Sequence, residues 1–362
     1  MNCKTAGESH GHGILALVEG FPAGITIDID EINAELKRRQ GGYGRGGRQA
    51  IETDTVEILT GVWQYKNHTC QSTGAPITLW VKNKDYRIDT APEITAPRPG
   101  HADLAGSIKF NEPIRPVLER ASARETAARV AAGALAKQYL KLHGITVVGY
   151  VAGIKGVSDV FPLKPLPVEE LIQRRNESEL YTVNHEHDNE YKQQIDTARR
   201  DGDSLGGVIE AVAFGVPIGL GSCMQWDEKL DGKIAQAVMS VQAIKSVEIG
   251  MGIRAAYEPG SKFHDPIQYS ETLKEVPGKG FVRPSNNAGG IEGGMSNGMP
   301  IVVRAAMKPI PTLVKGLPSI DINTKEPKTA GYERSDVCAV PAASVVLENV
   351  LAMEIAKAML ER

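Results

Sequence analysis

The first residues that could do chemistry are Ser9 and His10, in the segment Thr5-Ala-Gly-Glu-Ser-His-Gly-His-Gly13. Glycines surround both side chains, and glycine allows a closer backbone approach to a ligand than a residue with a Cβ. The unperturbed histidine ring exchanges a proton near neutral pH. The segment therefore fits a histidine beside a reacting ligand, and it also fits a turn with a surface histidine. We expect no strand or helix ahead of it.

Basic residues gather in the glycine-rich stretch Arg38-Arg-Gln-Gly-Gly-Tyr-Gly-Arg-Gly-Gly-Arg48. The planar fork of arginine binds phosphate and carboxylate groups bidentately. The stretch therefore indicates an anion site, or a solvated basic loop. Contact with single-stranded nucleic acid is the alternative function. It is disfavoured because the stretch has one aromatic residue and no repetition, and because the chain is acidic.

Two further segments combine charged residues with turn or cap signals. In Arg98-Pro-Gly-His-Ala-Asp103 an acid follows a histidine by two positions, which also fits an ordinary capped turn. In Arg120-Ala-Ser-Ala-Arg-Glu-Thr126, Ser122 and Glu125 form a capping box before an alanine-rich helix. The N–H groups and dipole at a helix N-terminus attract anions, and the two arginines strengthen that attraction.

Residues near the C-terminus offer two more candidates. A second glycine-rich stretch spans residues 289–298, and Lys308-Pro-Ile-Pro-Thr312 follows the next strand. Glycines with a lysine and a hydroxyl fit a phosphate cradle, and equally an ordinary turn. Arg334 and Asp336 form either a plain ion pair or, in a shielded site, a base beside a cation.

Several standard sites find no support. The sequence has no Gly-x-Gly-x-x-Gly after a strand, no P-loop motif, and no His-Glu-x-x-His or Cys/His cluster with metal-ligand spacing. We therefore expect no metal. The cysteines are scattered, which is typical of free thiols in a reducing compartment: Cys3, Cys70, Cys223 and Cys338.

The composition is that of a globular protein. The 362 residues are 41% hydrophobic and 23% charged, and the net charge of −3 does not favour nucleic acid or a membrane as partner. No apolar run approaches the roughly 18 residues that span a bilayer. The N-terminus lacks the pattern of a signal peptide. We expect a cytoplasmic protein.

The elements that must position these residues alternate between strands and helices. Strands are predicted at residues 14–29 (two, around a turn), 56–62, 77–81, 145–151, 207–212, 217–221 and 301–307. Helices are predicted from a cap at Asp30 to Arg39, and at residues 123–143, 185–203 (facing solvent), 231–245 and 342–361. Residues 259–290 are expected to form a long loop. The order favours an α+β or layered α/β fold in a single domain, residues 1–362.

Eight of these segments, in this order, resemble the chorismate synthase family. The segments from Thr5 and Arg120, with Arg334-Ser-Asp-Val-Cys338, resemble its three signatures. The other five are Arg39-Gln-Gly-Gly-Tyr-Gly-Arg45, residues 98–103, Trp226-Asp-Glu-Lys-Leu-Asp231, residues 242–250 and residues 289–298. The resemblance covers nearly the whole chain. It implies a single-domain β-α-β sandwich, with helices between antiparallel sheets, and a homotetramer.

The resemblance also implies a reaction of the shikimate pathway, which serves aromatic amino-acid biosynthesis. A lyase would convert 5-enolpyruvylshikimate 3-phosphate to chorismate and phosphate by anti-1,4-elimination. Reduced FMN would be required without net redox change, and either NADPH or an external reductant would reduce it. Substrate and FMN both carry anionic groups, which accounts for local arginines in an acidic chain.

Residue roles follow from the same resemblance. His10, helped by Ser9, would act at the leaving phosphate, His101 would protonate the reduced flavin, and Asp336 would assist removal of the C6 proton. Ser122 is counted with these catalytic residues. Anionic groups of substrate or NADPH would meet Arg39, Arg45, Arg48, Arg124 and Arg334. The flavin would contact Arg120, Ala121, Ser122, Gln242, Ala243, Gly293, Lys308, Pro309, Ile310, Pro311, Thr312 and Arg334.

Three features depart from the family's pattern. The arginine stretch that ends at Arg48 is slightly altered, and residues 64–72 read as a surface insertion. His12 stands where the family often differs, so it receives no catalytic role. The remaining histidines are expected at surface or structural positions: His68, His143, His185, His187 and His264.

Overall fold

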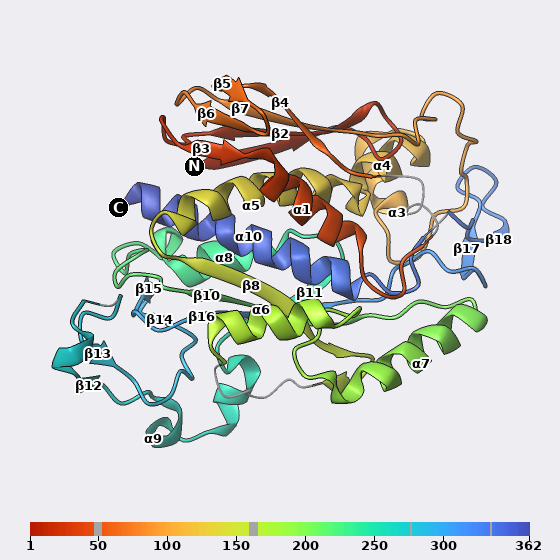
Figure 1. Ribbon diagram of the computed structural model, residues 1–362. Helices are drawn as coiled ribbons and strands as arrows, with labels where there is room; N and C mark the ends of the chain where they lie inside the picture. The colour runs from red at the N-terminus through yellow and green to blue at the C-terminus, as the bar shows by residue number, and fades with distance from the viewer. Residues whose placement is uncertain (47–52, 159–165, 276, 334) are drawn as a thin grey trace.

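Two antiparallel sheets enclose a layer of helices in the computed structural model, which describes residues 1–46, 53–158, 166–275, 277–333 and 335–362 (Figure 1). The upper sheet has the order β1 (Asn2–Ala6), β2 (Gly13–Glu19), β7 (Ile77–Lys82) and β4 (Val56–Thr60). The lower sheet has the order β11 (Ile244–Ile249), β16 (Ile301–Met307), β10 (Gly207–Phe214), β8 (Thr146–Ile154) and β9 (Val157–Ser158). This layering confirms the predicted α+β sandwich.

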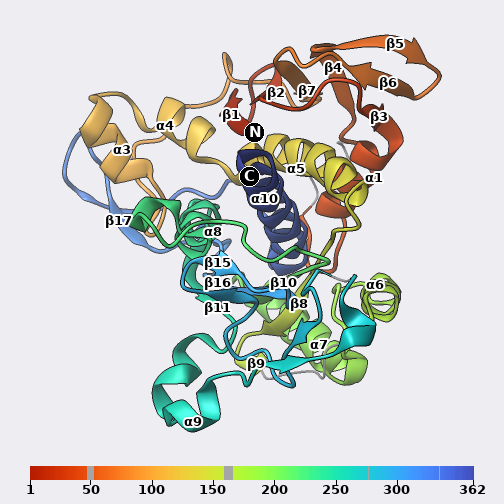
Figure 2. The ribbon, with the colours of Figure 1, turned by 90° about the vertical axis from the view of Figure 1, so that its left-hand side faces the viewer.

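Among the described residues, four helices lie between the sheets: α1 (Ile29–Gln40), α5 (Thr126–Lys141), α8 (Leu230–Met239) and α10 (Val340–Glu361). Figure 2 shows α5 and α10 side by side in this layer. Both are buried on nearly every side, as expected for helices that are apolar all round. Their alanines bring the two backbones close together. A Cβ on Gly133 of α5 would lie 2.4 Å from the Cβ of Asn349 on α10.

Gly133→Ala is therefore expected to destabilise the protein by about 1–3 kcal/mol, because the added methyl group has no room between the helices. This loss opposes the gain of about 1 kcal/mol that alanine brings to a helix. Gly232→Ala in α8 is the matched control, since its Cβ would meet nothing closer than 3.9 Å. Urea unfolding of both variants measures the difference. Equal stabilisation by the two substitutions would contradict the close packing.

The remaining elements surround these layers. A three-stranded sheet extends the upper side: β3 (Thr26–Asp28), β6 (Thr69–Ser72) and β5 (Val62–Lys66). The outer helices are α3 (Asp103–Phe110), α4 (Ile114–Ala121), α6 (Val168–Glu177), α7 (Asp188–Arg200) and α9 (Gly260–Phe263). Short hairpins are β12 (Gln268–Tyr269) with β13 (Phe281–Val282), β14 (Ile291–Glu292) with β15 (Met295–Ser296), and β17 (Pro318–Ile320) with β18 (Pro327–Thr329). Short 3₁₀ segments are η1 (Ala123–Glu125), η2 (His185–His187), η3 (Trp226–Glu228), η4 (Gly252–Tyr257) and η5 (Glu271–Leu273).

Several sequence predictions are wrong in detail. Strand β1 precedes the His10 segment, where no element was expected. Asp28, not Asp30, caps α1, because its Oδ1 accepts from the backbone N–H of Asp30 at 2.9 Å. The predicted helix 231–245 ends at Met239, and Ala243 has a left-handed φ of 69° before β11 begins. Residues 217–221 form no strand, since Gly219 and Gly221 also adopt positive φ angles.

The polar stretch 185–203 is helical as predicted, but it does not face solvent throughout. One face of α7 buries Tyr191, Ile195 and Ala198. The predicted insertion 64–72 belongs to the hairpin β5–β6, which pairs with β3 and buries Cys70. Helices α3, α4 and α6 were not predicted. The five histidines expected at surface or structural positions reach the surface. His187 is half-buried, and the other four are exposed: His68, His143, His185 and His264.

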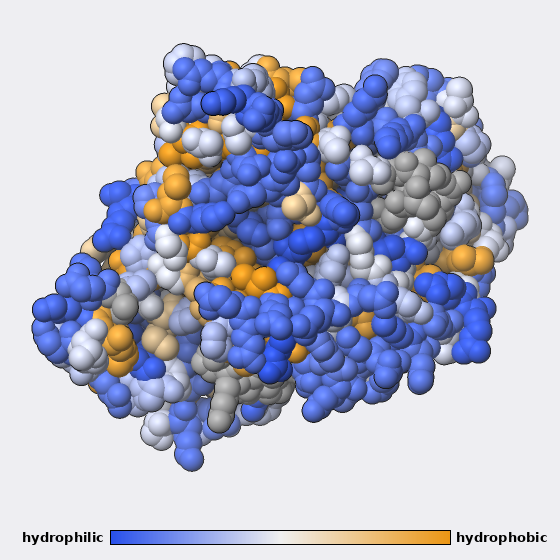
Figure 3. Space-filling model, in the orientation of Figure 1, coloured by the Kyte–Doolittle hydropathy of each residue, from blue (hydrophilic) through white to orange (hydrophobic). Residues whose placement is uncertain are grey.

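The view in Figure 3 shows a mostly hydrophilic face. No helix in the described part of the chain combines the length and the apolar character that a membrane span requires.

Candidate active site

A cavity of about 380 Å³ collects most of the predicted site residues from segments far apart in the sequence. Its lining draws on the His10 loop, the end of α1, the loop after β7, the α4–α5 junction, the ends of α8 and β16, and the start of α10. The predicted residues that line it are Ser9, His10, Arg39, Arg45, His101, Ala121, Ser122, Arg124, Gln242, Ala243, Lys308, Ile310, Pro311, Thr312 and Asp336.

Three predicted residues in the described part of the chain do not join this lining, and two more lie outside that part. Arg120 is exposed, and its guanidinium donates to the backbone oxygens of Thr5 and Gly7, at 2.9 and 3.2 Å. Gly293 lies in the β14–β15 turn, and Pro309 is absent from the lining. The remaining two, Arg48 and Arg334, lie outside the described residues.

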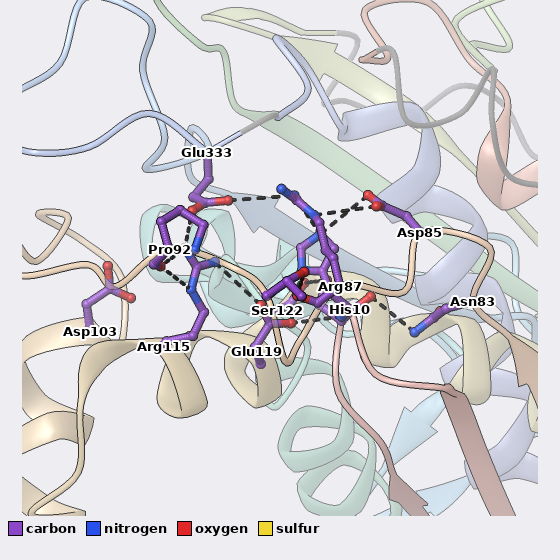
Figure 4. A network of polar contacts seen from close by, with 12 residues as sticks. His10, Asn83, Asp85, Arg87, Pro92, Asp103, Arg115, Glu119, Ser122 and Glu333 are labelled. Atoms are coloured by element: carbon purple, nitrogen blue, oxygen red, sulfur yellow. Dashed lines mark hydrogen bonds and ion pairs between the residues drawn. The ribbon is translucent and has the colours of Figure 1, made fainter.

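The His10 loop is held by a carboxylate and an amide (Figure 4). Glu119 of α4 accepts from the backbone N–H of His10 at 2.8 Å, and its oxygens lie 3.0 Å from Nδ1 of the ring. Asn83 donates to three backbone oxygens of the loop, at 2.8–3.1 Å. Gly7 is required at φ 101°, because a Cβ there would lie 2.2 Å from the carbonyl oxygen of Gly13. The ring is thus fixed with Nδ1 on Glu119.

The Glu119 carboxylate remains ionised in spite of its burial. Burial raises its pKa, but the hydrogen bonds from His10 and the charge of Arg115 outweigh this and lower the pKa below its usual value. Arg115 lies 3.6 Å from Glu119 and also binds Glu333 at 3.0 Å. An ionised Glu119 favours a proton on Nδ1 of His10.

His101 has a similar partner. Its Nδ1 lies 2.5 Å from Oδ1 of the fully buried Asp103, which also pairs with Arg98 at 2.8 Å. Burial raises the pKa of Asp103, but the hydrogen bonds from His101 and Arg98 lower it well below its ordinary value. Arg98 also donates to Thr312 at 2.9 Å, which ties the His101 turn to the residues after β16. The ring is oriented with Nδ1 toward the carboxylate.

Arginines also line the cavity. Arg124 binds Asp54 at 2.7 Å, and Arg39 lies 3.6 Å from the same carboxylate. Burial lowers the pKa of Arg39 to about 10. The charges of Arg124 and Arg45 act in the same direction, and the charge of Asp54 acts against it. Arg45 pairs with Asp336 at 2.8 Å, and Asp336 also accepts from the backbone N–H of Gly46 at 2.6 Å.

The cavity lining is therefore richer in basic than in acidic side chains. Among the described residues it contains six basic side chains, Arg39, Arg45, Arg87, Arg98, Arg124 and Lys308, against three acidic ones, Asp85, Glu333 and Asp336. Burial and the nearby Lys245 lower the pKa of Lys308. Such a cavity suits ligands that carry several anionic groups.

These contacts disfavour the nucleic-acid alternative for the part of the arginine stretch that the structure describes. Arg38 is turned inward to Glu35 and Glu348, Arg39 is buried, and Arg45 pairs with Asp336. They present no stripe of exposed guanidinium groups to a strand.

The capping box at the start of α5 is only half formed. Ser122 accepts from the backbone N–H of Arg124 at 3.2 Å, as predicted. The Glu125 carboxylate instead binds Thr5, Arg129 and Gln242. A short 3₁₀ turn, η1, thus precedes α5, and Ser122 faces Ser9 at 3.2 Å in the cavity.

Comparison with known proteins identifies the family. The family model described as chorismate synthase matches residues 1–360. The chain belongs to the chorismate synthase family. It is accordingly an enzyme, a lyase that acts on a small molecule in chorismate synthesis.

Chorismate synthases of known sequence and structure support this assignment along the whole chain. The protein of Geotalea uraniireducens is 53% identical over 98% of this chain and 92% of its own length. That of Aquifex aeolicus is 51% identical over 99% and 92%. A solved structure titled "Crystal Structure of Chorismate Synthase" is 43% identical, with a TM-score of 0.78 over 99% of this chain and 91% of the other.

Sequence reasoning missed several residues of this chorismate synthase site. Asp85 and Arg87 line the cavity, and Asn83, Asp54 and Glu119 lie directly behind it. The sequence does carry a signal for Asn83, Asp85 and Arg87, because they belong to one charged segment, Asn83-Lys-Asp-Tyr-Arg87, that directly follows β7. No local pattern distinguishes Glu119, whose partner lies 109 residues away.

Proposed function

We propose that this enzyme eliminates phosphate from 5-enolpyruvylshikimate 3-phosphate to give chorismate, with reduced FMN bound beside the substrate. The observation that carries the proposal is that one basic cavity contains His10, His101 and Asp336. A doubly carboxylated phosphate ester and a flavin phosphate together need several cations in one site. We further propose that the enzyme is cytoplasmic and a homotetramer.

The residues of the cavity fit a bound flavin. Apolar side chains for a planar ring come from Val241, Met307 and Ile310. The buried Oε1 of Gln242 has no hydrogen-bond partner among the described residues, so it is available to an N–H donor of a ligand. Ala121, Ser122, Ala243, Lys308 and Thr312 would complete the cofactor contacts. When bound, reduced FMN would supply electron density to the substrate and recover it, without net oxidation.

The chain's own residues then bind the substrate and handle two protons. The arginines hold the anionic groups. The C3–O bond breaks with its electron pair leaving on phosphate, and His10 donates a proton to that phosphate. Asp336, beside Arg45, accepts the proton from C6 while the new double bond forms. In its imidazolium form His101 would hold a proton at Nε2, while its Nδ1–H donates to Asp103.

An anaerobic assay tests the proposed function. Photoreduced FMN with the enolpyruvyl substrate is expected to give equal amounts of chorismate and phosphate, and oxidised FMN neither. A parallel reaction with oxidised FMN and NADPH shows whether the enzyme can use NADPH as the reductant. Absence of both products with reduced FMN would refute the proposal.

A further inference from the structure

Two charged side chains of opposite sign compete for Nε2 of His10 (Figure 4). Nη2 of Arg87 lies 3.1 Å from Nε2, and Oδ2 of Asp85 lies 3.6 Å from it. A guanidinium only donates, so it pairs with an Nε2 that carries no proton. A carboxylate favours an Nε2 that carries one. The two neighbours therefore favour opposite protonation states of the ring.

The shorter contact selects the neutral ring. With Nδ1 directed to Glu119 and Nε2 accepting from Arg87, the ring carries its proton on Nδ1 only. In this arrangement His10 has no proton on the atom that faces Arg87 and Asp85. A change at Arg87 must occur before Nε2 can donate.

Arg87 is the loosely held arginine of this group. Its other ion pairs are long, 3.4 Å to Asp85 and 4.0 Å to Glu333, and its side chain is 36% exposed. Arg98 and Arg124, in contrast, are buried and pair with carboxylates at 2.8 and 2.7 Å. The backbone beside Arg87 is fixed, since the N–H groups of Arg87 and Ile88 both donate to the His10 carbonyl at 3.1 Å. The guanidinium can thus exchange partners while the loop stays in place.

We propose that Arg87 binds the phosphate monoester of the substrate and thereby controls the protonation of His10. An arriving phosphate dianion draws the guanidinium away from Nε2, because a charge-assisted pair is stronger than a bond to a neutral imidazole. Asp85 and the phosphate then face Nε2, and the ring takes up a proton from solvent. Glu119 stays on Nδ1, with Arg115 behind it and Glu333 beside Arg87.

The proton balance is complete without another reactant. His10 gains one proton from solvent as the phosphate binds. In the reaction, which rests on the function proposed above, that proton passes from Nε2 to the leaving phosphate as the C3–O bond breaks. The ring is then neutral again and can accept the Arg87 N–H once phosphate departs.

Nitrogen NMR of the ¹⁵N-histidine-labelled enzyme tests the proton step without turnover. In the ligand-free protein, Nε2 of His10 is expected to resonate as an unprotonated nitrogen, and addition of inorganic phosphate should protonate it. The His10→Gln variant assigns the signal. In Arg87→Gln, Nε2 should be protonated before phosphate is added, whereas Asp85→Asn should weaken the response. FMN alone should leave the signal unchanged, so a response to FMN and not to phosphate would overturn the assignment to the substrate's phosphate.

Steady-state kinetics test the binding step. Arg87→Gln is expected to raise KM for the phosphorylated substrate by about 10- to 100-fold, the loss typical of a charged hydrogen bond. Arg87→Lys should fall between it and the wild type. Arg174→Gln, on the exposed face of α6, is the matched control and should leave KM unchanged. Unchanged KM in Arg87→Gln, or a wild-type Nε2 that ignores phosphate, would overturn the inference even if chorismate is formed. Absence of chorismate with an intact NMR response would instead refute only the proposed reaction.

Discussion

His10→Ala is expected to lower kcat for chorismate formation by about 10²–10⁴-fold, the range typical of a lost general acid. The ring is buried, and Glu119 orients it from one side through Nδ1. Alanine removes the proton donor and leaves the Glu119 carboxylate without its ring partner. Single-turnover measurement of phosphate release with reduced FMN separates this effect from product release.

His12, in the same loop as His10, provides a control that distinguishes loss of the proton donor from a general disturbance of the loop. His12 stacks on Tyr86 with ring centroids 4.5 Å apart, and it does not line the cavity. His12→Ala should therefore leave kcat close to the wild-type value. His101→Ala should lower kcat in the same range as His10→Ala, since Asp103 orients its ring in the same way. Wild-type phosphate release in His10→Ala would remove that residue from the mechanism.

The sequence predicted the elements whose signals are local. Strand β16 spans residues 301–307 as predicted, because a run of β-branched and small apolar residues is flanked by proline and glycine. Helix α10 begins two residues before the predicted start, and Pro341 occupies its first turn. The errors arise where long-range contacts override propensity. Helix α8, for example, ends early so that Ile244 can join β16 as part of β11.

The residues of the candidate site also fall into two groups, those that local sequence motifs identify and those that depend on distant partners. Histidines and arginines in glycine-rich motifs were found, since they stand out by residue type. Glu119 and Asp54 were not, because each is an ordinary acid whose role depends on a partner 70 or more residues away. The competition between Arg87 and Asp85 at His10 depends on side-chain distances, which no spacing in the sequence encodes.

A buried ion cluster beside the site carries the largest expected effect on stability. Glu348 of α10 is 1% exposed and accepts from Arg38, Arg175 and the backbone N–H of Gly149 at 2.9–3.1 Å, with Lys137 also in contact. Burial raises the pKa of Glu348, but these cations outweigh burial and lower the pKa well below its usual value. Burial lowers the pKa of Arg38, but Glu348 and Glu35 raise it above its usual value. Arg38 directly precedes Arg39, so the cluster also anchors the end of α1 at the cavity.

Glu348→Gln is expected to destabilise the protein by about 3–5 kcal/mol, because it leaves several buried cations without their shared carboxylate. Glu170→Gln removes an exposed partner of Arg174 and should cost only about 0–1 kcal/mol. Urea unfolding at neutral pH measures both. The pKa of Glu348 is lowered by folding, so its contribution is present above the unfolded pKa of about 4.3 and is lost as the pH falls toward the folded value. The difference between wild type and Glu348→Gln should therefore shrink in acid, and a difference that stays constant would show that charge pairing is not its source.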